Sequence, residues 1–265
     1  MRSKTKFLAI LTIAISIVPA ARGQGAQVKV AAAADLTFAL AELAPLYESQ
    51  THNKLRIVYG SSGNFFSQIQ NGAPFDVFLS ADVEFPLKLQ SAGLTEPGTL
   101  HKYAIGEVAL WAPSDSGMDL PRQKWRALTD AKVQKIAIAN PQHAPYGRAA
   151  IAALKKAGVY EQVAPKLVYG ENVSQAAQFV QSGNAQVGIL ALSLVLSPRM
   201  KSGQHWEIPG DMHEQIEQAA VVLKRASDKQ AARALVDFLR SDAARVILID
   251  YGFTFPPPSA PTRKH

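Results

Sequence analysis

The sequence predicts an α/β protein of two lobes, each built on a mixed, mostly parallel sheet flanked by helices. Short runs rich in β-branched and aromatic residues alternate with helical patterns, which is typical of strand–helix–strand units. The alternation comes in two sets, and roughly 240 residues after an N-terminal leader are enough for two lobes of ordinary size. We therefore expect a ligand site in the cleft between the lobes, beyond the carboxyl ends of the strands.

Residues 1–23 have the three parts of a secretory signal peptide. A basic start is followed by the apolar run Phe7–Val18 and then by small residues, with cleavage after Ala20 or after Gly23. The run is too short to span a bilayer comfortably, so an N-terminal membrane anchor is the less favoured alternative. We expect a periplasmic protein. Because the chain has no cysteine, we expect no disulfide and no lipid-modified N-terminal cysteine.

The charge of the chain does not indicate a nucleic-acid partner. The formal net charge is +7, and four basic residues (Arg2, Lys4, Lys6 and Arg22) lie in or next to the leader. The remaining positive charge is mild and spread along the chain rather than gathered in a patch.

The first lobe is predicted to comprise residues 27–108 and 220–260. Helical patterns follow its first two strands, and Pro74 lies beyond the end of the second of these patterns. A long helix at Lys229–Ile249 is expected to return to this lobe, and residues 261–265 to form a flexible tail. The strands are expected at Val28–Ala34, Leu55–Tyr59, Phe75–Leu79 and Ala219–Leu223, with a strand-like run at Ile105–Trp111.

The second lobe is predicted to comprise residues 109–219. One helix is expected at Pro145–Ala157, with Gly158 as its stop, and another is marked by the spacing of Val173, Ala177 and Val180. Its strands are expected at Lys135–Ala139, Leu167–Tyr169 and Gln186–Leu190.

Four of these strands end in small or polar residues where a helix begins. The first N–H groups of a helix have no partner within it, and the helix dipole adds partial positive charge there. Two such boundaries fall in each lobe, so all four are expected to face one cleft and to hold a small multivalent anion. For the serines between Gly60 and Gly63, a simple helix cap in a tight turn is the alternative. The boundaries are Ala31–Leu36, Gly60–Asn64, Asn140–Gly147 and Gly170–Ser174.

The sequence gives little support for an enzyme. Gly60–Asn64 lacks the final glycine of a G-x-S-x-G nucleophile elbow, and the six histidines show no metal-ligand spacing. Phosphate-loop and dinucleotide fingerprints are also absent from the sequence. We expect no catalysis and no cofactor; a serine hydrolase that uses Ser62 with His143 is the less favoured alternative.

Together, five motifs resemble those of the periplasmic molybdate-binding proteins of ABC importers, within the type II periplasmic binding proteins. They are Ala32–Leu36, Gly60–Gly63, Gly72–Asp82, Asn140–Gly147 and Gly170–Val173, and the likeness runs from about Val28 to Phe255. The resemblance implies two lobes that close by a hinge on a tetrahedral oxyanion, molybdate or tungstate. It also implies delivery to a membrane permease without catalysis, and we expect a monomer. The same fold with sulfate, phosphate or an organic anion is the alternative.

Carried over residue by residue, the resemblance implies that Ala34, Asp35, Ser61, Ser62, Tyr146 and Val173 bind the ligand. Ser62 is expected to offer its hydroxyl and N–H, while Tyr146 and Val173 offer N–H groups from the second lobe. Asp76 and Asp82, in the third motif, are interpreted as structural.

Two positions depart from the family pattern. Asp35 replaces a serine of many members, and a carboxylate repels a dianion. We therefore expect its side chain to turn away and cap its own helix, leaving the N–H groups of Asp35 and Ala34 for the ligand. Ala191 stands where some members have a tyrosine that binds the oxyanion. Either the Tyr146 hydroxyl replaces that tyrosine, or Tyr146 gives only its N–H and its ring packs in the cleft.

Overall fold

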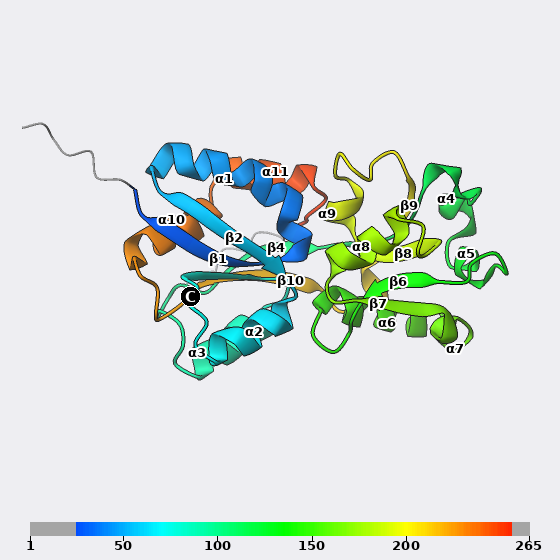
Figure 1. The fold of residues 1–265 in the computed structure, drawn as a ribbon, viewed down its shortest axis with the longest axis horizontal. Helices are drawn as coiled ribbons and strands as arrows, with labels where there is room; N and C mark the ends of the chain where they lie inside the picture. Colours follow the sequence, from blue (N-terminus) through cyan, green and yellow to red (C-terminus); the bar gives the residue numbers. More distant parts are fainter. Residues whose placement is uncertain (1–24, 256–265) are drawn as a thin grey trace, which may run out of the picture.

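The computed structural model describes residues 25–255, so the predicted leader and tail lie outside the described residues. Two lobes lie side by side, and each contains a five-stranded sheet with helices packed against it (Figure 1). The predicted fold class, two mixed sheets flanked by helices, is confirmed. None of the helices within residues 25–255 is long and apolar enough to cross a membrane.

The sheet of the first lobe has the order β2-β1-β3-β10-β4. Its strands are β1 (Gln27–Ala33), β2 (Lys54–Gly60), β3 (Val77–Ser80), β4 (His101–Gly106) and β10 (Ile216–Val222). The first three run parallel, whereas β10 runs antiparallel to both of its neighbours. The carboxyl ends of β1, β2 and β3 therefore meet at the edge that faces the second lobe (Figure 1).

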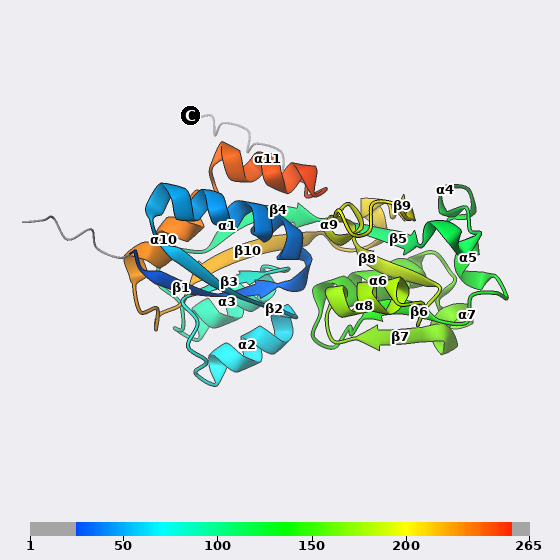
Figure 2. The ribbon, with the colours of Figure 1, turned by 45° about the horizontal axis from the view of Figure 1, so that its top comes forward.

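Helices cover both faces of this sheet, as Figure 2 shows. On one face lie α1 (Thr37–Thr51), α10 (Lys229–Phe238) and α11 (Asp242–Asp250); on the other lie α2 (Ser62–Gln70) and α3 (Glu84–Ser91). The alternation of side chains along β1 explains this, because Val28 and Val30 pack in the cluster of α1 and α10. Ala31 instead packs with Phe65 and Ile69 of α2.

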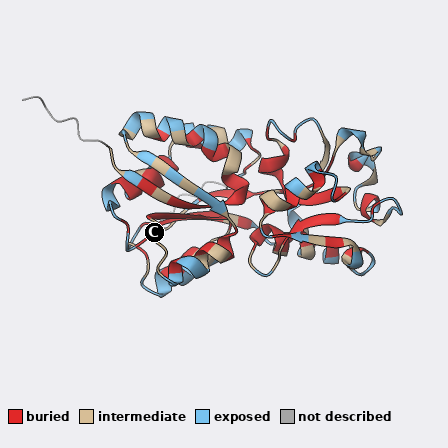
Figure 3. Cartoon of the chain, viewed as in Figure 1, coloured by how far each residue is buried: buried red, intermediate tan, exposed pale blue. Residues whose placement is uncertain are grey.

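The sheet of the second lobe has the order β7-β6-β8-β5-β9. Its strands are β5 (Val108–Ala112), β6 (Ile136–Ala139), β7 (Leu167–Gly170), β8 (Val187–Ala191) and β9 (Gln204–Glu207). Its helices are α4 (Leu120–Gln123), α5 (Arg126–Thr129), α6 (Pro145–Lys156), α7 (Tyr160–Val163), α8 (Val173–Gln181) and α9 (Leu192–Val195). Figure 3 shows that the strands at the centre of both sheets are buried, while the outer faces of the helices are exposed.

Short 3₁₀ turns complete the fold: η1 (Ala34–Leu36), η2 (Ser114–Ser116), η3 (Ala164–Lys166) and η4 (Gly210–Met212). The first of them matters most for function, because it follows directly from β1 and lies where the two lobes meet.

Three details differ from the sequence prediction. The run predicted as one strand at Ile105–Trp111 is divided between β4 and β5, which belong to different sheets, so the chain crosses between the lobes at Glu107. The helix predicted at Lys229–Ile249 is two helices, because Ser241 is extended and its side chain accepts from the N–H of Ala244 to cap α11. The prediction also missed β9 and α3, and the chain returns to the first lobe between β9 and β10.

Candidate functional site

A small cavity of about 10 Å³, lined mostly by buried residues, lies between the lobes, at the carboxyl ends of β1, β2, β6 and β7. Each of these strands leads directly, or through a short loop, into η1, α2, α6 or α8. The cavity lining includes all six residues predicted to bind a ligand: Ala34, Asp35, Ser61, Ser62, Tyr146 and Val173. The structure thus brings together residues that are more than one hundred positions apart in the sequence.

The first lobe contributes the start of α2. Ser62 is the first residue of this helix and is almost fully buried. Its hydroxyl oxygen accepts a hydrogen bond from the N–H of Ala81 at 2.9 Å, so the hydroxyl proton remains free for another acceptor. Ser61 precedes the helix but does not cap it through its side chain; its hydroxyl lies 3.0 Å from Nδ1 of His143. Ser61 thus occupies the N-cap position of α2, but its side chain does not make the capping hydrogen bond of the simple alternative.

The second lobe contributes the starts of α6 and α8. Tyr146 follows Pro145 in the first turn of α6, and Val173 is the first residue of α8. The side chain of Asn172 caps α8 by accepting from the N–H of Gln175, which leaves the N–H of Val173 uncommitted. Together with α2, three helix N-termini from two lobes point their partial positive charge at one cavity.

Asp35 is buried, with 1% of its surface exposed. Its Oδ2 accepts hydrogen bonds from the Tyr146 hydroxyl at 3.0 Å and from Nε2 of Gln218. Its Oδ1 is buried and has no hydrogen-bond partner among the described residues. Burial raises the pKa of this carboxyl from 3.8 to about 6, although hydrogen bonds from Gln218 and Tyr146, and then from the N–H groups of Asp35 and Leu36, act in the opposite direction.

Capping of its own helix start is not the main role of the Asp35 side chain, because its two side-chain hydrogen bonds come from other elements. The carboxylate finds its donors on other elements instead: the Tyr146 hydroxyl on α6 and the Gln218 amide on β10. The hydroxyl of Tyr103 donates to Oε1 of Gln218 at 2.8 Å, which orients the amide so that its nitrogen faces Asp35. No sequence pattern identified Gln218, since it lies within a buried strand far from the helix starts.

The hydroxyl of Tyr146 is committed to the protein. It donates to Asp35 and accepts from Gln218 at 3.2 Å, and burial together with the charge of Asp35 raises its pKa well above the usual value. A Cβ placed on Gly106 would lie 2.2 Å from this hydroxyl, so only glycine leaves room for it. These contacts agree with the alternative in which Tyr146 offers a ligand its N–H alone.

Several contacts join the lobes around the cavity. The N–H of Gly63 donates to the carbonyl of His143 at 2.9 Å, and the side chains of Asn64 and Glu171 are hydrogen bonded at 3.1 Å. The hydroxyl of Ser174 donates to the carbonyl of Ala34 at 2.9 Å. These contacts show that the two lobes are closed on one another around the cavity.

The two aspartates of the third motif have different surroundings. Asp76 is buried; its carboxylate accepts from the N–H of Lys29 at 2.7 Å and from the N–H and hydroxyl of Ser227. The side chain of Asp82 accepts from the N–H of Phe85 and also pairs with Arg148 of the second lobe. Asp76 is thus structural, as predicted, whereas Asp82 also joins the lobes, which the sequence did not indicate.

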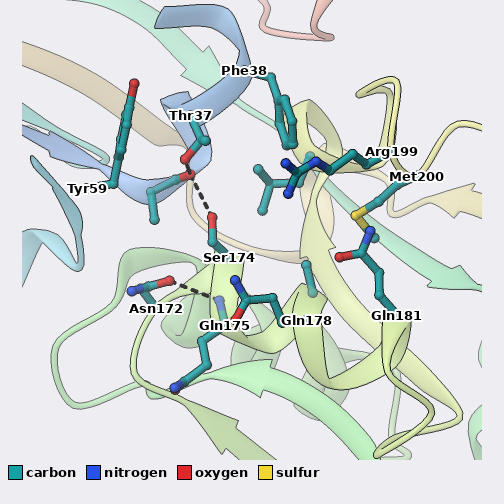
Figure 4. A pocket seen from close by; sticks show the side chains of 13 residues that line it. Thr37, Phe38, Tyr59, Asn172, Ser174, Gln175, Gln178, Gln181, Arg199 and Met200 are labelled. Atoms are coloured by element: carbon teal, nitrogen blue, oxygen red, sulfur yellow. Dashed lines mark hydrogen bonds between the residues drawn. The ribbon is translucent and has the colours of Figure 1, made fainter. Parts of the chain in front are cut away.

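A larger space of about 350 Å³ lies next to the cavity and shares Ala34 and Asn172 with it. Figure 4 shows amide side chains projecting into it and Arg199 beside the ring of Phe38, 5.9 Å from the ring centroid. Arg199, the cation at this space, is exposed. The smaller cavity is the better candidate for an anion site, because buried helix N-termini converge there.

The geometry does not favour the hydrolase alternative. His143 contacts Ser61 rather than the proposed nucleophile Ser62, whose hydroxyl is bonded to the N–H of Ala81. Across residues 25–255, no group of three or more histidine, aspartate or glutamate side chains is arranged to hold a metal ion.

Comparison with known proteins identifies the family. The profile described as "Bacterial extracellular solute-binding protein" matches residues 28–254. The chain belongs to this family. It is 41% identical to the molybdate-binding protein ModA of Azotobacter vinelandii, over 88% of this chain and 92% of that protein. It is 40% identical to ModA of Rhodobacter capsulatus, over 89% of this chain and 90% of that protein.

Two solved structures have the same fold as this chain. The periplasmic molybdate-binding protein of Azotobacter vinelandii superposes with a TM-score of 0.81 at 33% identity, covering 87% of this chain and all of that one. The sulfate-binding protein SubI of Mycobacterium tuberculosis superposes with a TM-score of 0.72 at 15% identity, which shows a shared fold alone.

Proposed function

We propose that this protein is the molybdate-binding protein of an ABC importer, and that it binds tungstate equally well. The observation that carries the proposal is the convergence of three helix N-termini, from both lobes, on one buried cavity. The two ModA relatives at 40–41% identity support molybdate as the ligand.

The chemistry of the cavity suits a tetrahedral dianion. The N–H groups of Ser62, Tyr146 and Val173, the free proton of the Ser62 hydroxyl and the N–H groups of Ala34 and Asp35 are neutral donors. Such donors hold an anion without a buried counter-charge. Molybdate and tungstate have nearly the same size and charge, so hydrogen bonds distinguish them poorly. Sulfate is smaller, and a cavity fitted to longer metal–oxygen bonds leaves its oxygens out of reach.

Closure of the two lobes on the ligand links binding to transport. We assign residues 27–106 and 216–255 to the first lobe and residues 108–207 to the second, so the predicted second boundary at 219/220 moves to the segment between β9 and β10. A ligand that bridges the N–H donors of both lobes stabilises the closed arrangement of the protein. A membrane permease can then distinguish the closed, loaded protein from the open, empty one. In this account the exported protein is a periplasmic monomer that delivers its anion and does no catalysis.

A thermal melt of the mature protein with molybdate, tungstate, sulfate or phosphate, each at equal excess, tests the proposal. A ligand that binds only the folded state stabilises it by about 4 kcal/mol at a thousandfold excess over Kd. We expect a large upward shift of Tm with molybdate and tungstate alone. A shift with sulfate or phosphate of the same size would reject the proposed selectivity. Hydrolysis of a chromogenic ester would instead support the serine hydrolase.

A further inference from the structure

The carboxyl group of Asp35 is an unexpected part of an anion site. It lines the cavity, it is buried, and none of the described residues forms an ion pair with it. An ionised carboxylate in a closed, water-poor cavity repels a dianion strongly. Either the anion binds weakly, or the negative charge of Asp35 is removed when the anion binds.

The two oxygens of this carboxyl are not equivalent. Oδ2 is occupied by the donors of Tyr146 and Gln218, and the orientation of Gln218 is fixed by Tyr103. Oδ1 is buried and has no partner among residues 25–255. A proton therefore has one place to bind, and once bound it converts an unpaired acceptor into a hydrogen-bond donor.

We propose that the closed site takes up one proton, on Oδ1 of Asp35, together with each oxyanion dianion. The protonated carboxyl then adds a neutral donor to the N–H groups of the cavity. The inference rests on the proposed function and deepens it: the site recognises a fully ionised oxyanion plus a proton, whereas an ionised Asp35 would suit a ligand that carries its own proton, such as hydrogen phosphate.

The surroundings of Asp35 support proton uptake. Burial already raises its pKa to about 6 without a ligand, and a dianion nearby raises it further. The titratable groups around it, Tyr146 on α6, Tyr103 on β4 and Glu107 beyond the Tyr146 hydroxyl, are neutral or negative and do not favour its ionised form. The neighbouring helices α2, α8 and α9 contain no titratable residue.

His143 is the histidine that contacts the cavity lining, with its Nδ1 3.0 Å from the hydroxyl of Ser61. A proton taken up by His143 would give a similar pH dependence. Two substitutions separate the two residues: Asp35→Asn removes the proposed proton site while keeping the size of the side chain, and His143→Gln removes the imidazole.

The test is calorimetric titration of molybdate into the mature protein at about pH 7.5, in buffers that differ in ionisation enthalpy. The slope of the observed binding enthalpy against the ionisation enthalpy of the buffer gives the number of protons taken up per molybdate. We expect close to one proton per molybdate for the wild type and for His143→Gln, and close to none for Asp35→Asn. The Kd of the wild type is expected to rise about tenfold from pH 7 to pH 8, and that of Asp35→Asn less than twofold.

Each outcome has a clear meaning. Molybdate binding without proton uptake in the wild type overturns the inference and leaves the proposed function intact. Because this result comes from the wild type alone, it decides the inference even if Asp35→Asn does not fold. Uptake that survives in Asp35→Asn and is lost in His143→Gln assigns the proton to His143 and also overturns it. Tighter binding of phosphate than of molybdate shows that Asp35 stays ionised. Absence of molybdate and tungstate binding even at about pH 6, where protons are plentiful, rejects the proposed function itself.

Discussion

The hydroxyl of Tyr146, in the second lobe, donates a hydrogen bond of 3.0 Å to Oδ2 of Asp35, in the first lobe. Because the two groups belong to different lobes and both are buried, this bond forms only when the lobes are closed. It places the carboxylate in the lining of the cavity with one of its oxygens already hydrogen bonded. It also removes the Tyr146 hydroxyl from the set of ligand donors.

Replacing Tyr146 with Phe is therefore expected to change stability more than ligand recognition. The substitution deletes a buried donor to Asp35, which costs about 1–3 kcal/mol of unfolding free energy. At about pH 6, where Asp35 is readily protonated, the Kd for molybdate should change less than about threefold. Urea unfolding and calorimetry measure both effects, and Tyr169→Phe, at a half-exposed tyrosine, is the control. A loss of affinity above tenfold at this pH would show that the hydroxyl binds the ligand.

Ser62 is expected to contribute directly to binding. Its oxygen accepts from Ala81, so its proton is available to the anion, and a hydrogen bond to a charged group is worth about 1.5–3 kcal/mol. Ser62→Ala should weaken molybdate binding by roughly 10-fold to 150-fold. Ser67→Ala, on the exposed face of the same helix, is the matched control and should leave Kd unchanged. Equal affinities for the two variants would remove Ser62 from the site.

Closure of the lobes is expected to depend on the absence of a side chain at Gly63. A Cβ at this position would lie 2.7 Å from the carbonyl oxygen of His143, which belongs to the other lobe. Gly63→Ala should therefore disfavour the closed form and weaken molybdate binding more than about tenfold, while the Tm without ligand stays within a few degrees. Gly210→Ala, where a Cβ meets nothing within 4 Å, is the control.

Small-angle scattering gives an independent reading of Gly63→Ala. The wild type is expected to become more compact when molybdate is added, and the variant to remain extended at the same ligand concentration. Compaction of the variant to the wild-type value would show that the loop of His143 yields and that this contact does not limit closure.

The burial of Asp35 also predicts how stability depends on pH. Because the pKa is raised from 3.8 to about 6 in the folded state, the folded chain binds more protons than the unfolded chain between these values. The contribution of Asp35 to the free energy of unfolding is therefore fully present below about pH 4. It is lost as the pH rises through about 6, and the total loss is up to about 3 kcal/mol. Asp35→Asn should be more stable than the wild type at pH 8, with the difference vanishing near pH 4. Urea unfolding across this range measures it, and a constant difference would contradict the account.

Asp76 provides the opposite case. Its carboxylate accepts charge-assisted hydrogen bonds from the backbone N–H groups of Lys29 and Ser227, so it ties β1 to the segment that precedes α10. Asp76→Ala should destabilise the protein by about 2–4 kcal/mol. Its Kd for molybdate, measured well below Tm, should remain near the wild-type value. A selective loss of affinity would give Asp76 a role in the site.

The sequence was most informative where local chemistry decides the structure. The helix starts at Ser62, Pro145 and Val173 follow from glycine, proline and asparagine at strand ends, and they carry Ser61, Ser62, Tyr146 and Val173 to the cavity; Ala34 and Asp35 reach it from the end of β1. Contacts that depend on tertiary structure were not predictable. Gln218 reaches Asp35 only because β10 returns antiparallel beside β3 and β4, and nothing near position 35 in the sequence indicates that strand.

The failed prediction for Asp35 has the same origin. A carboxylate at the end of a strand normally finds backbone N–H groups of the following turn. Here Tyr146 and Gln218 compete for it from two other elements, and the lobes must close before either is in place.

A crystal structure of the mature protein with tungstate tests the central claim most directly, because the anomalous signal of tungsten locates the anion without ambiguity. The account predicts one tungsten per chain in the cavity between the lobes, with oxygens within hydrogen-bond distance of the N–H groups of Ser62, Tyr146 and Val173. Tungsten in the larger space beside Arg199, or on one lobe alone, would contradict it.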